Sequence, residues 1–303
     1  MPRSTPGRWR CRQSGSASRT AGECNDRWIA VACEPVEAAR RCLEETGLGP
    51  GEIDHLIFVS TTGLAAPSID ARIMTELRMC PNTRRTLIWG WPRGQARWGS
   101  RVRPSMPARI PGSGRCSSAS NSCSLTFQFD DRSVRNLVAA SLFADGAAAV
   151  LVEGDECAGA GPRIVDSEST LFPDSLDLMG WDIGDAGMQV VFGARIPCVV
   201  TEHFRPLAEG FLGRHDLPLD AIDHHIAHPG GAKVLAAYDR AGDLCPDALV
   251  HSRAVLRRCG NMSSATVLYV LRRFLDEGIA PGEHGLLTVF GPGFSSEMVL
   301  LAG

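Results

Sequence analysis

One histidine and one asparagine stand out because each lies at the edge of a glycine-containing turn. His228 follows the apolar run AIDHHIA, which is typical of the end of a buried strand, and Pro229-Gly230-Gly231 then turns the chain away. Asn261 follows Gly260 and precedes a segment with helical spacing of its apolar residues. A neutral imidazole and a carboxamide brought together at a strand end and a helix start can donate hydrogen bonds to a carbonyl oxygen and stabilise an enolate.

Alternating strand and helix patterns surround these two residues and would have to position them. Residues 25–47 have helical spacing and end on a glycine, HLIFVSTTG predicts a buried strand, and IDARIMTELRM predicts another helix. The C-terminal part repeats this alternation and closes as two short strands around Gly291-Pro292-Gly293. The pattern predicts an α/β fold in two halves, residues 25–155 and 160–303.

Composition narrows the classes of protein that the chain can belong to. Its 303 residues are 44% hydrophobic and 21% charged, and the net charge of −3 gives no reason to expect nucleic-acid or membrane binding. No apolar run reaches the length of a membrane span. Eleven cysteines without a CxxC motif fit reduced thiols in the cytoplasm, and the spacing of His224, His225 and His228 does not suit a metal site.

The N-terminal segment differs from the rest of the chain. Its first 22 residues contain five arginines and no acidic residue, and they show neither periodicity nor an apolar stretch. We therefore expect residues 1–24 to form a disordered or non-native tail rather than a secretory signal.

Several strings together carry a resemblance to a known family. Besides HPGG at His228 they are STTGLAAPSID from Ser60, CSLTFQFDD from Cys123, NLVAASLFADGAAAVLV from Asn136 and VFGPGFSSEMVLL from Val289. In content and order they resemble the type III polyketide synthases, the chalcone and stilbene synthase family of the thiolase superfamily, in a bacterial form. The resemblance implies a thiolase-like, five-layered αβαβα fold of two similar halves, and a homodimer.

The resemblance also implies a reaction and its substrates. In this family a cysteine thiolate takes an acyl group from coenzyme A, and malonyl-CoA loses carbon dioxide to give an enolate that extends the acyl chain. The substrates are malonyl-CoA and an acyl-CoA starter, and no further cofactor is implied. By motif match, His228 and Asn261 are the catalytic donors to the thioester carbonyl. The alternative role for His228 is a buried core histidine with satisfied hydrogen bonds, and the alternative role for Asn261 is a helix N-cap.

Further positions match residues that surround the substrate in the family. Phe143 matches the phenylalanine between the coenzyme A tunnel and the cavity, and its alternative is plain core packing. Seven further residues match substrate-binding positions of the family, and ordinary turn geometry or packing could equally explain each of them. They are Cys123, Thr126, Gly230, Gly231, Gly291, Pro292 and Gly293.

Residues 87–122 are anomalous. No aspartate or glutamate occurs from Leu77 to Gln128, and prolines at 92, 104, 107 and 111 prevent a long helix. Nothing in the segment alternates as a strand would, so the pattern predicts a long structureless stretch, which is unusual inside a compact domain. Aligning the family motif from Arg84 puts Arg93 at the position of the nucleophilic cysteine, which is therefore absent.

A corrected slip of the reading frame would explain a segment of family-like length with unrelated residues. When GC-rich codons are chosen for Trp98 to Ser122 and read one base early, they give GLARAAVYARAHPGQRAVLLSVEL. This translation predicts a helix, a turn and an apolar strand that leads directly into CSLTFQ. The hypothesis assumes free codon choice.

Three functional interpretations remain open from the sequence. The first is an acyltransferase that performs the decarboxylative Claisen condensation of malonyl-CoA onto an acyl-CoA starter. The second is a decayed or non-catalytic homologue that lacks the nucleophile and at most decarboxylates malonyl-CoA. The third is an enzyme similar to β-ketoacyl carrier-protein synthase III, although HPGG and the FGPG ending favour the polyketide synthase.

Overall fold

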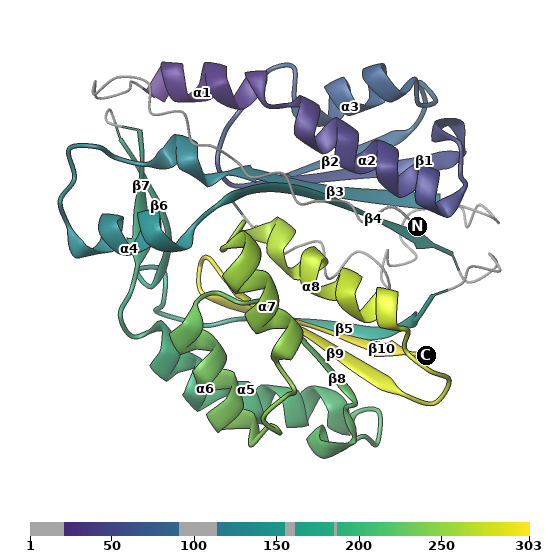
Figure 1. Ribbon diagram of the computed structural model, residues 1–303, viewed down its shortest axis with the longest axis vertical. Coiled ribbons are helices and arrows are strands. Elements are labelled where there is room, and N and C mark those ends of the chain that lie inside the picture. The colour runs from purple at the N-terminus through teal and green to yellow at the C-terminus, as the bar shows by residue number, and fades with distance from the viewer. Residues whose placement is uncertain (1–20, 91–113, 155–160, 185–186) are drawn as a thin grey trace.

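The N-terminal half is a four-stranded sheet with helices on its outer face (Figure 1). The structure is a computed structural model that describes residues 21–90, 114–154, 161–184 and 187–303. The sheet order is β2-β1-β3-β4, in which β1 is parallel to both neighbours and β4 is antiparallel to β3. The elements of this half are α1 (Ala21–Ala30), α2 (Cys33–Thr46), β1 (Ile53–Ser60), α3 (Ile69–Leu77), β2 (Arg84–Trp89), β3 (Gly114–Ser122), α4 (Val134–Leu142) and β4 (Asp145–Glu153).

The C-terminal half has a second four-stranded sheet in the order β5-β10-β9-β8. A separate hairpin, β6–β7, lies beside α4. The elements are β5 (Arg163–Leu171), β6 (Met179–Gly184), β7 (Gly187–Phe192), α5 (Ile196–Gly213), β8 (His224–Ala227), α6 (Ala232–Gly242), α7 (Val250–Cys259), α8 (Ser264–Glu277), β9 (His284–Gly291) and β10 (Ser295–Ala302). Short 3₁₀ helices occur at Pro50–Glu52, Cys123–Thr126 and Leu219–Ala221.

The two halves stack into five layers, as expected from the family resemblance. In Figure 1, α1–α3 cover the first sheet, α8 lies between the two sheets, and α5 and α6 cover the second sheet. The halves share a pairing pattern, because β8 is parallel to β9 and β10 antiparallel to it, just as β1, β3 and β4 are related. Burial of the second sheet on both faces explains why almost every residue of β9 and β10 is buried.

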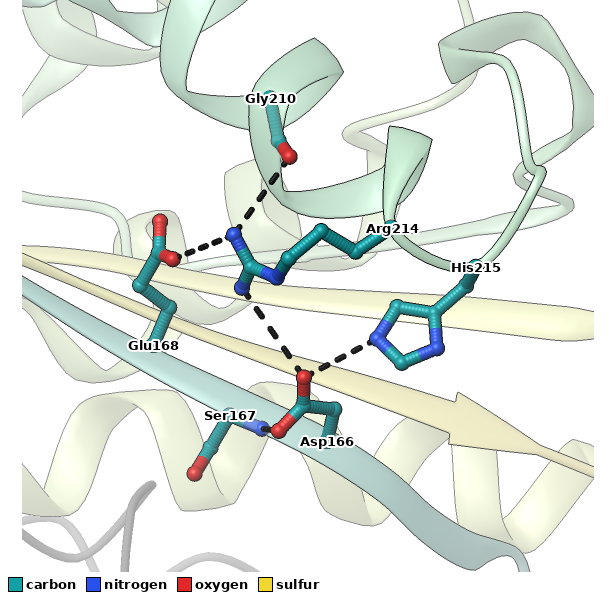
Figure 2. A network of polar contacts seen from close by, with 6 residues as sticks. All are labelled: Asp166, Ser167, Glu168, Gly210, Arg214 and His215. Atoms are coloured by element: carbon teal, nitrogen blue, oxygen red, sulfur yellow. Dashed lines mark hydrogen bonds and ion pairs between the residues drawn. The ribbon is translucent and has the colours of Figure 1, made fainter.

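Helix α5 is fixed to the edge of the second sheet by charged side chains at its C-terminal end (Figure 2). The Arg214 Nη1 atom lies 2.7 Å from a carboxylate oxygen of Glu168, and His215 Nε2 lies 3.0 Å from Asp166 Oδ2. Cations are stabilised at this end of a helix by its dipole. None of the helices in the ranges described is long and apolar enough to cross a membrane.

The structure corrects the expectation of a structureless stretch at both ends of residues 87–122, while residues 91–113 lie outside the described residues. Residues 87–89 belong to β2, and residues 114–122 form β3, a central strand between β1 and β4. The side-chain pattern missed β3 because backbone hydrogen bonds to a strand on each side define it, while serine and asparagine occupy all but one of its described buried positions. Arg93 lies outside the described residues. Helix α1 begins at Ala21, so its first four residues fall within the segment 1–24 that was expected to be a disordered or non-native tail.

Candidate active site

His228 continues the path of β8 by one residue at the end of the second sheet. Its backbone N–H donates to the carbonyl oxygen of Thr288 on β9 at 2.9 Å, and its side chain is buried. The N–H of Gly230 then donates to the His228 carbonyl at 2.9 Å, which closes the turn before α6. The strand end and the turn that follow from the sequence pattern therefore fix the imidazole in the interior.

Asn261 is tied to the segment that follows α4. Its N–H donates to Leu142 O and its carbonyl accepts from Ala144 N, both at 2.9 Å, so that Asn261 and Phe143 form a parallel bridge. Gly260 precedes it with φ 72°, and a Cβ atom there would lie 3.1 Å from Leu142 O. Glycine is required at this position by both the backbone conformation and the close approach.

The hydrogen bonds around Asn261 determine which way its side-chain amide faces. The Oδ1 atom accepts from the N–H of Ser263 at 2.9 Å, and Nδ2 donates to the carbonyl of Gly230 at 3.3 Å. Because a backbone N–H can only donate and a carbonyl can only accept, the oxygen and nitrogen of the amide are assigned unambiguously. One hydrogen of Nδ2 is directed to the turn that follows His228, and the second can bind a ligand oxygen.

A cavity between the two halves contains both residues. Polar groups are few on its wall, and aromatic and aliphatic side chains make up most of it, so that a hydrogen bond to a ligand inside is stronger than in water. Its lining comprises Thr61, Cys123, Phe143, Met179, Gly180, Trp181, Val190, Val191, Phe192, Ile196, His228, Gly230, Val234, Tyr238, Asn261, Ser263, Phe290 and Pro292.

Cys123 lies on this wall, at the start of a 3₁₀ helix, and its surroundings disfavour the thiolate. Burial raises the pKa of the Cys123 thiol far above its usual value, and the nearby Asp145 carboxylate raises it further. A nucleophilic cysteine needs the opposite environment, with a lowered pKa and a cation or helix N-terminus nearby. The geometry agrees with excluding Cys123 as the nucleophile while leaving it on the cavity wall.

Only some of the remaining residues predicted from the sequence to bind substrate line this cavity. Phe143 lies within the cavity lining, with its ring centroid 6.4 Å from that of Trp181 and 6.1 Å from that of Phe192. Gly230 and Pro292 also line the cavity. Among the described residues, four others lie outside this lining: Thr126, Gly231, Gly291 and Gly293. Thr126 lines a wider cleft beside β4 and α8 instead.

The histidines of β8 do not converge on one point. His224 Nε2 lies 2.8 Å from a carboxylate oxygen of Glu283, at the far end of the strand from His228. His225 is buried on β8. In the ranges that the structure describes, no group of three or more His, Cys, Asp or Glu side chains is arranged to hold a metal ion.

Sequence reasoning missed several residues of the site. Thr61 and Ser263 line the cavity, as do Trp181 and Phe192 from the β6–β7 hairpin. A signal existed for Thr61, because it directly follows the buried strand β1 of the first sheet, just as His228 directly follows β8 of the second sheet. The hairpin aromatics carried no such signal, since only the tertiary arrangement brings them to Phe143.

Comparisons with known proteins agree with this geometry. The family model described as "Chalcone and stilbene synthases, N-terminal domain" matches residues 25–156, and that for the C-terminal domain of the same family matches residues 163–303. The chain is 40% identical to 1,3,6,8-tetrahydroxynaphthalene synthase of Streptomyces peucetius subsp. caesius, over 92% of this chain and 75% of that protein. It is 30% identical to 3,5-dihydroxyphenylacetyl-CoA synthase of Amycolatopsis balhimycina, over 99% of this chain and 80% of that protein.

Solved structures show the same relationship. The crystal structure of 1,3,6,8-tetrahydroxynaphthalene synthase from Streptomyces coelicolor A3(2), described as a bacterial type III polyketide synthase, superposes with a TM-score of 0.87. The match has 29% sequence identity and covers 95% of this chain and 82% of that one. The fold is therefore the thiolase-like fold predicted from the sequence. The chain belongs to the chalcone and stilbene synthase family, the type III polyketide synthases.

Proposed function

We propose that the chain performs the chemistry of an acyltransferase of the type III polyketide synthase kind: it forms the enolate of malonyl-CoA, and condensation with an acyl-CoA starter follows where the nucleophilic cysteine is present. The observation that carries the proposal is the Asn261 amide, whose Nδ2 faces the His228 turn at the wall of a largely apolar cavity. The relatives are named as synthases of tetrahydroxynaphthalene and of dihydroxyphenylacetyl-CoA, which supports polyketide products. Neither of these two relatives is named as a β-ketoacyl carrier-protein synthase, the third interpretation left open by the sequence.

The proposed reaction begins when the thioester carbonyl of malonyl-CoA binds near His228 and Asn261. The bond from the α-carbon to the carboxylate breaks, carbon dioxide leaves, and the electron pair moves onto the thioester oxygen as an enolate. Hydrogen bonds from the imidazole and from Asn261 Nδ2 stabilise that oxyanion. The enolate carbon then attacks the carbonyl of an acyl thioester, a carbon–carbon bond forms, and the thiolate leaves.

The nucleophile that should carry the acyl group is where this chain departs from its family. Arg93 occupies the motif position of the cysteine, and a guanidinium cannot form an acyl thioester. With the chain as written, the enolate would take up a proton and leave as acetyl-CoA. A cysteine restored by a corrected reading frame would permit the full condensation.

We propose that the protein acts as a homodimer in the cytoplasm, with coenzyme A thioesters as substrates and no additional cofactor. An exposed apolar stripe on α4 supports a contact with a second copy. Val134, Leu137 and Val138 lie on one side of this helix and are 75%, 56% and 40% exposed. Apolar residues at this spacing usually face a partner or a core.

Two measurements test the proposal together. Resequencing the gene across the codons for Arg85 to Cys123 shows whether a base is missing and whether a cysteine replaces Arg93. Product analysis with malonyl-CoA and a starter acyl-CoA then distinguishes the outcomes. Polyketide from the chain as written would refute the argument from Arg93, acetyl-CoA alone would show decarboxylation without condensation, and unchanged malonyl-CoA would refute the proposed function for this chain.

A further inference from the structure

Behind Asn261, a buried carboxamide on β3 connects the two halves of the molecule. The Asn121 side chain is 0% exposed and bonds to residues of both halves. Its Oδ1 atom accepts from the backbone N–H and from the hydroxyl of Thr61, both at 2.9 Å, directly after β1. Its Nδ2 atom donates to the hydroxyl oxygen of Ser264, the first residue of α8, at 2.6 Å.

The two ends of the Asn121 amide cannot exchange roles. The Thr61 backbone N–H requires an acceptor, so it fixes Oδ1 toward β1 and leaves Nδ2 as the only group that faces α8. Each of these buried bonds is costly to lose, because no water replaces the missing partner. Asn121 thus holds the start of α8 at a fixed place against the end of β1.

Ser263 transmits this placement to Asn261. It lies directly before Ser264 and has φ 54° and ψ −127°, a conformation that is unfavourable for a residue other than glycine. Its N–H donates to Asn261 Oδ1 at 2.9 Å, which is the bond that turns Nδ2 of Asn261 toward Gly230. A strained backbone of this kind persists only where its neighbours hold it on both sides.

We propose that Asn121 is a positioning residue that sets the direction of the Asn261 amide through Ser264 and Ser263. Asn121 is absent from the cavity lining and acts through the start of α8 rather than on substrate. The proposal rests on the proposed function for its kinetic consequence, but its structural consequence is independent of any activity.

Three variants of the full chain test it. Asn121→Leu keeps the approximate shape and removes all three hydrogen bonds, whereas Ser264→Ala removes only the bond to α8. Thr83→Val is the matched control, because it removes a buried hydroxyl bond of 2.9 Å to Ile53 O at the far end of β1. The side-chain amide signal of Asn261 is recorded by ¹⁵N NMR and assigned by its disappearance in Asn261→Asp.

Both test variants are expected to shift or broaden the Asn261 side-chain signal, and Thr83→Val is expected to leave it in place. For malonyl-CoA decarboxylation, kcat should fall by up to about 100-fold while KM changes less than about twofold, since binding is retained and alignment is lost. An unchanged Asn261 signal in folded Ser264→Ala would overturn the proposal, even if Asn121→Leu fails to fold. If the unmodified chain does not turn over malonyl-CoA, the proposed function fails while the NMR result still decides the role of Asn121.

Discussion

At the scale of single residues, the site depends on how a carboxamide is oriented rather than on its presence. Ser263 N–H and Gly230 O hold opposite ends of the Asn261 amide, so that a donor faces the turn after His228. A donor held in place before the reaction needs no rearrangement as negative charge develops on an oxygen, which is why such groups contribute strongly to rate.

Replacing Asn261 by alanine should therefore slow malonyl-CoA decarboxylation by about 100- to 1,000-fold, the usual effect of removing one oxyanion donor. The KM for malonyl-CoA should change little, since the donor acts on the transition state. Steady-state measurement of acetyl-CoA formation checks both values. Full activity in a folded Asn261→Ala protein would show that this amide has no part in the reaction.

The cysteines should differ sharply in reactivity. Cys198 and Cys245 are exposed, whereas Cys123 is buried and its thiol pKa is raised by that burial. Since the thiolate is the reactive form, iodoacetamide at pH 8 should modify Cys198 and Cys245, as well as the exposed Cys33, and leave Cys123 unmodified in the folded protein. Peptide mass spectrometry reads out each site. Modification of Cys123 at the rate of Cys198 would contradict its assignment as an inert wall residue.

The sequence could predict His228 and Asn261 because each carries a local signal, a strand or helix boundary beside glycine. Motif matches give chain position alone, so they do not tell which of the matched residues line the cavity: Gly230 and Pro292 do, whereas Thr126 and Gly231 lie outside its lining. Asn121 carried no local signal at all. Its importance arises from contacts with residues 60 and 143 positions away.

At the scale of elements, β3 is a central, buried strand, yet all but one of its described buried positions hold polar residues that are unsuitable for an apolar core. Ser118 and Ser120 are fully buried, and Ser118 is opposite Ala149, whose side chain packs against the apolar cluster under α2. Within the part of the chain that the structure describes, neither serine hydroxyl has a hydrogen-bond partner. An apolar strand would suit this environment better, as the hypothesis of a corrected reading-frame slip predicts.

Removing the Ser118 hydroxyl should therefore stabilise the protein. Ser118→Ala is expected to raise the free energy of unfolding by about 1 kcal/mol, because a buried hydroxyl without a partner is costly. Ser252→Ala is the control of opposite sign, since the Ser252 hydroxyl is equally buried but donates to Ala227 O at 2.6 Å. Urea denaturation of the three proteins measures the differences. A loss of stability in Ser118→Ala would show that the Ser118 hydroxyl stabilises β3, which contradicts the prediction.

The five layers were predictable from the alternation of strand and helix patterns, together with the family motifs. Strand β3 could not be predicted in this way. A sequence pattern shows only the kinds of side chain, whereas β3 is defined by its backbone pairing with β1 and β4. The contrast with β10 is direct: VLLA continues an apolar run and was predicted as a strand, whereas CSSASNS was not.

At the scale of the whole molecule, stability should depend on pH through His225 on β8. Burial, together with a smaller effect of the neighbouring His224, lowers the pKa of His225 to about 4 from an ordinary value of 6.5. Between these values the unfolded chain binds a proton that the folded chain does not. The contribution to stability is therefore complete above pH 6.5 and is lost as the pH falls toward 4.

The loss should approach about 3 kcal/mol at the acidic end of that range. It is measured as the free energy of unfolding between pH 4.5 and 7, in comparison with His225→Phe, which should show a shallower dependence. His203→Asn is the control at a partly exposed histidine and should keep the original slope. Equal slopes for the unmodified protein and His225→Phe would contradict the assignment to His225.

The most direct test of the whole account is the fate of malonyl-CoA when it is incubated with the purified, folded chain and with His228→Ala. Mass spectrometry of the coenzyme A esters, with carbon dioxide release measured in parallel, follows the decarboxylation that the described residues would perform. We predict one acetyl-CoA for each carbon dioxide released by the chain as written, and a large loss of this activity in His228→Ala. Intact malonyl-CoA with the folded chain, or equal turnover by both proteins, would contradict the assignment of enolate stabilisation to His228 and Asn261.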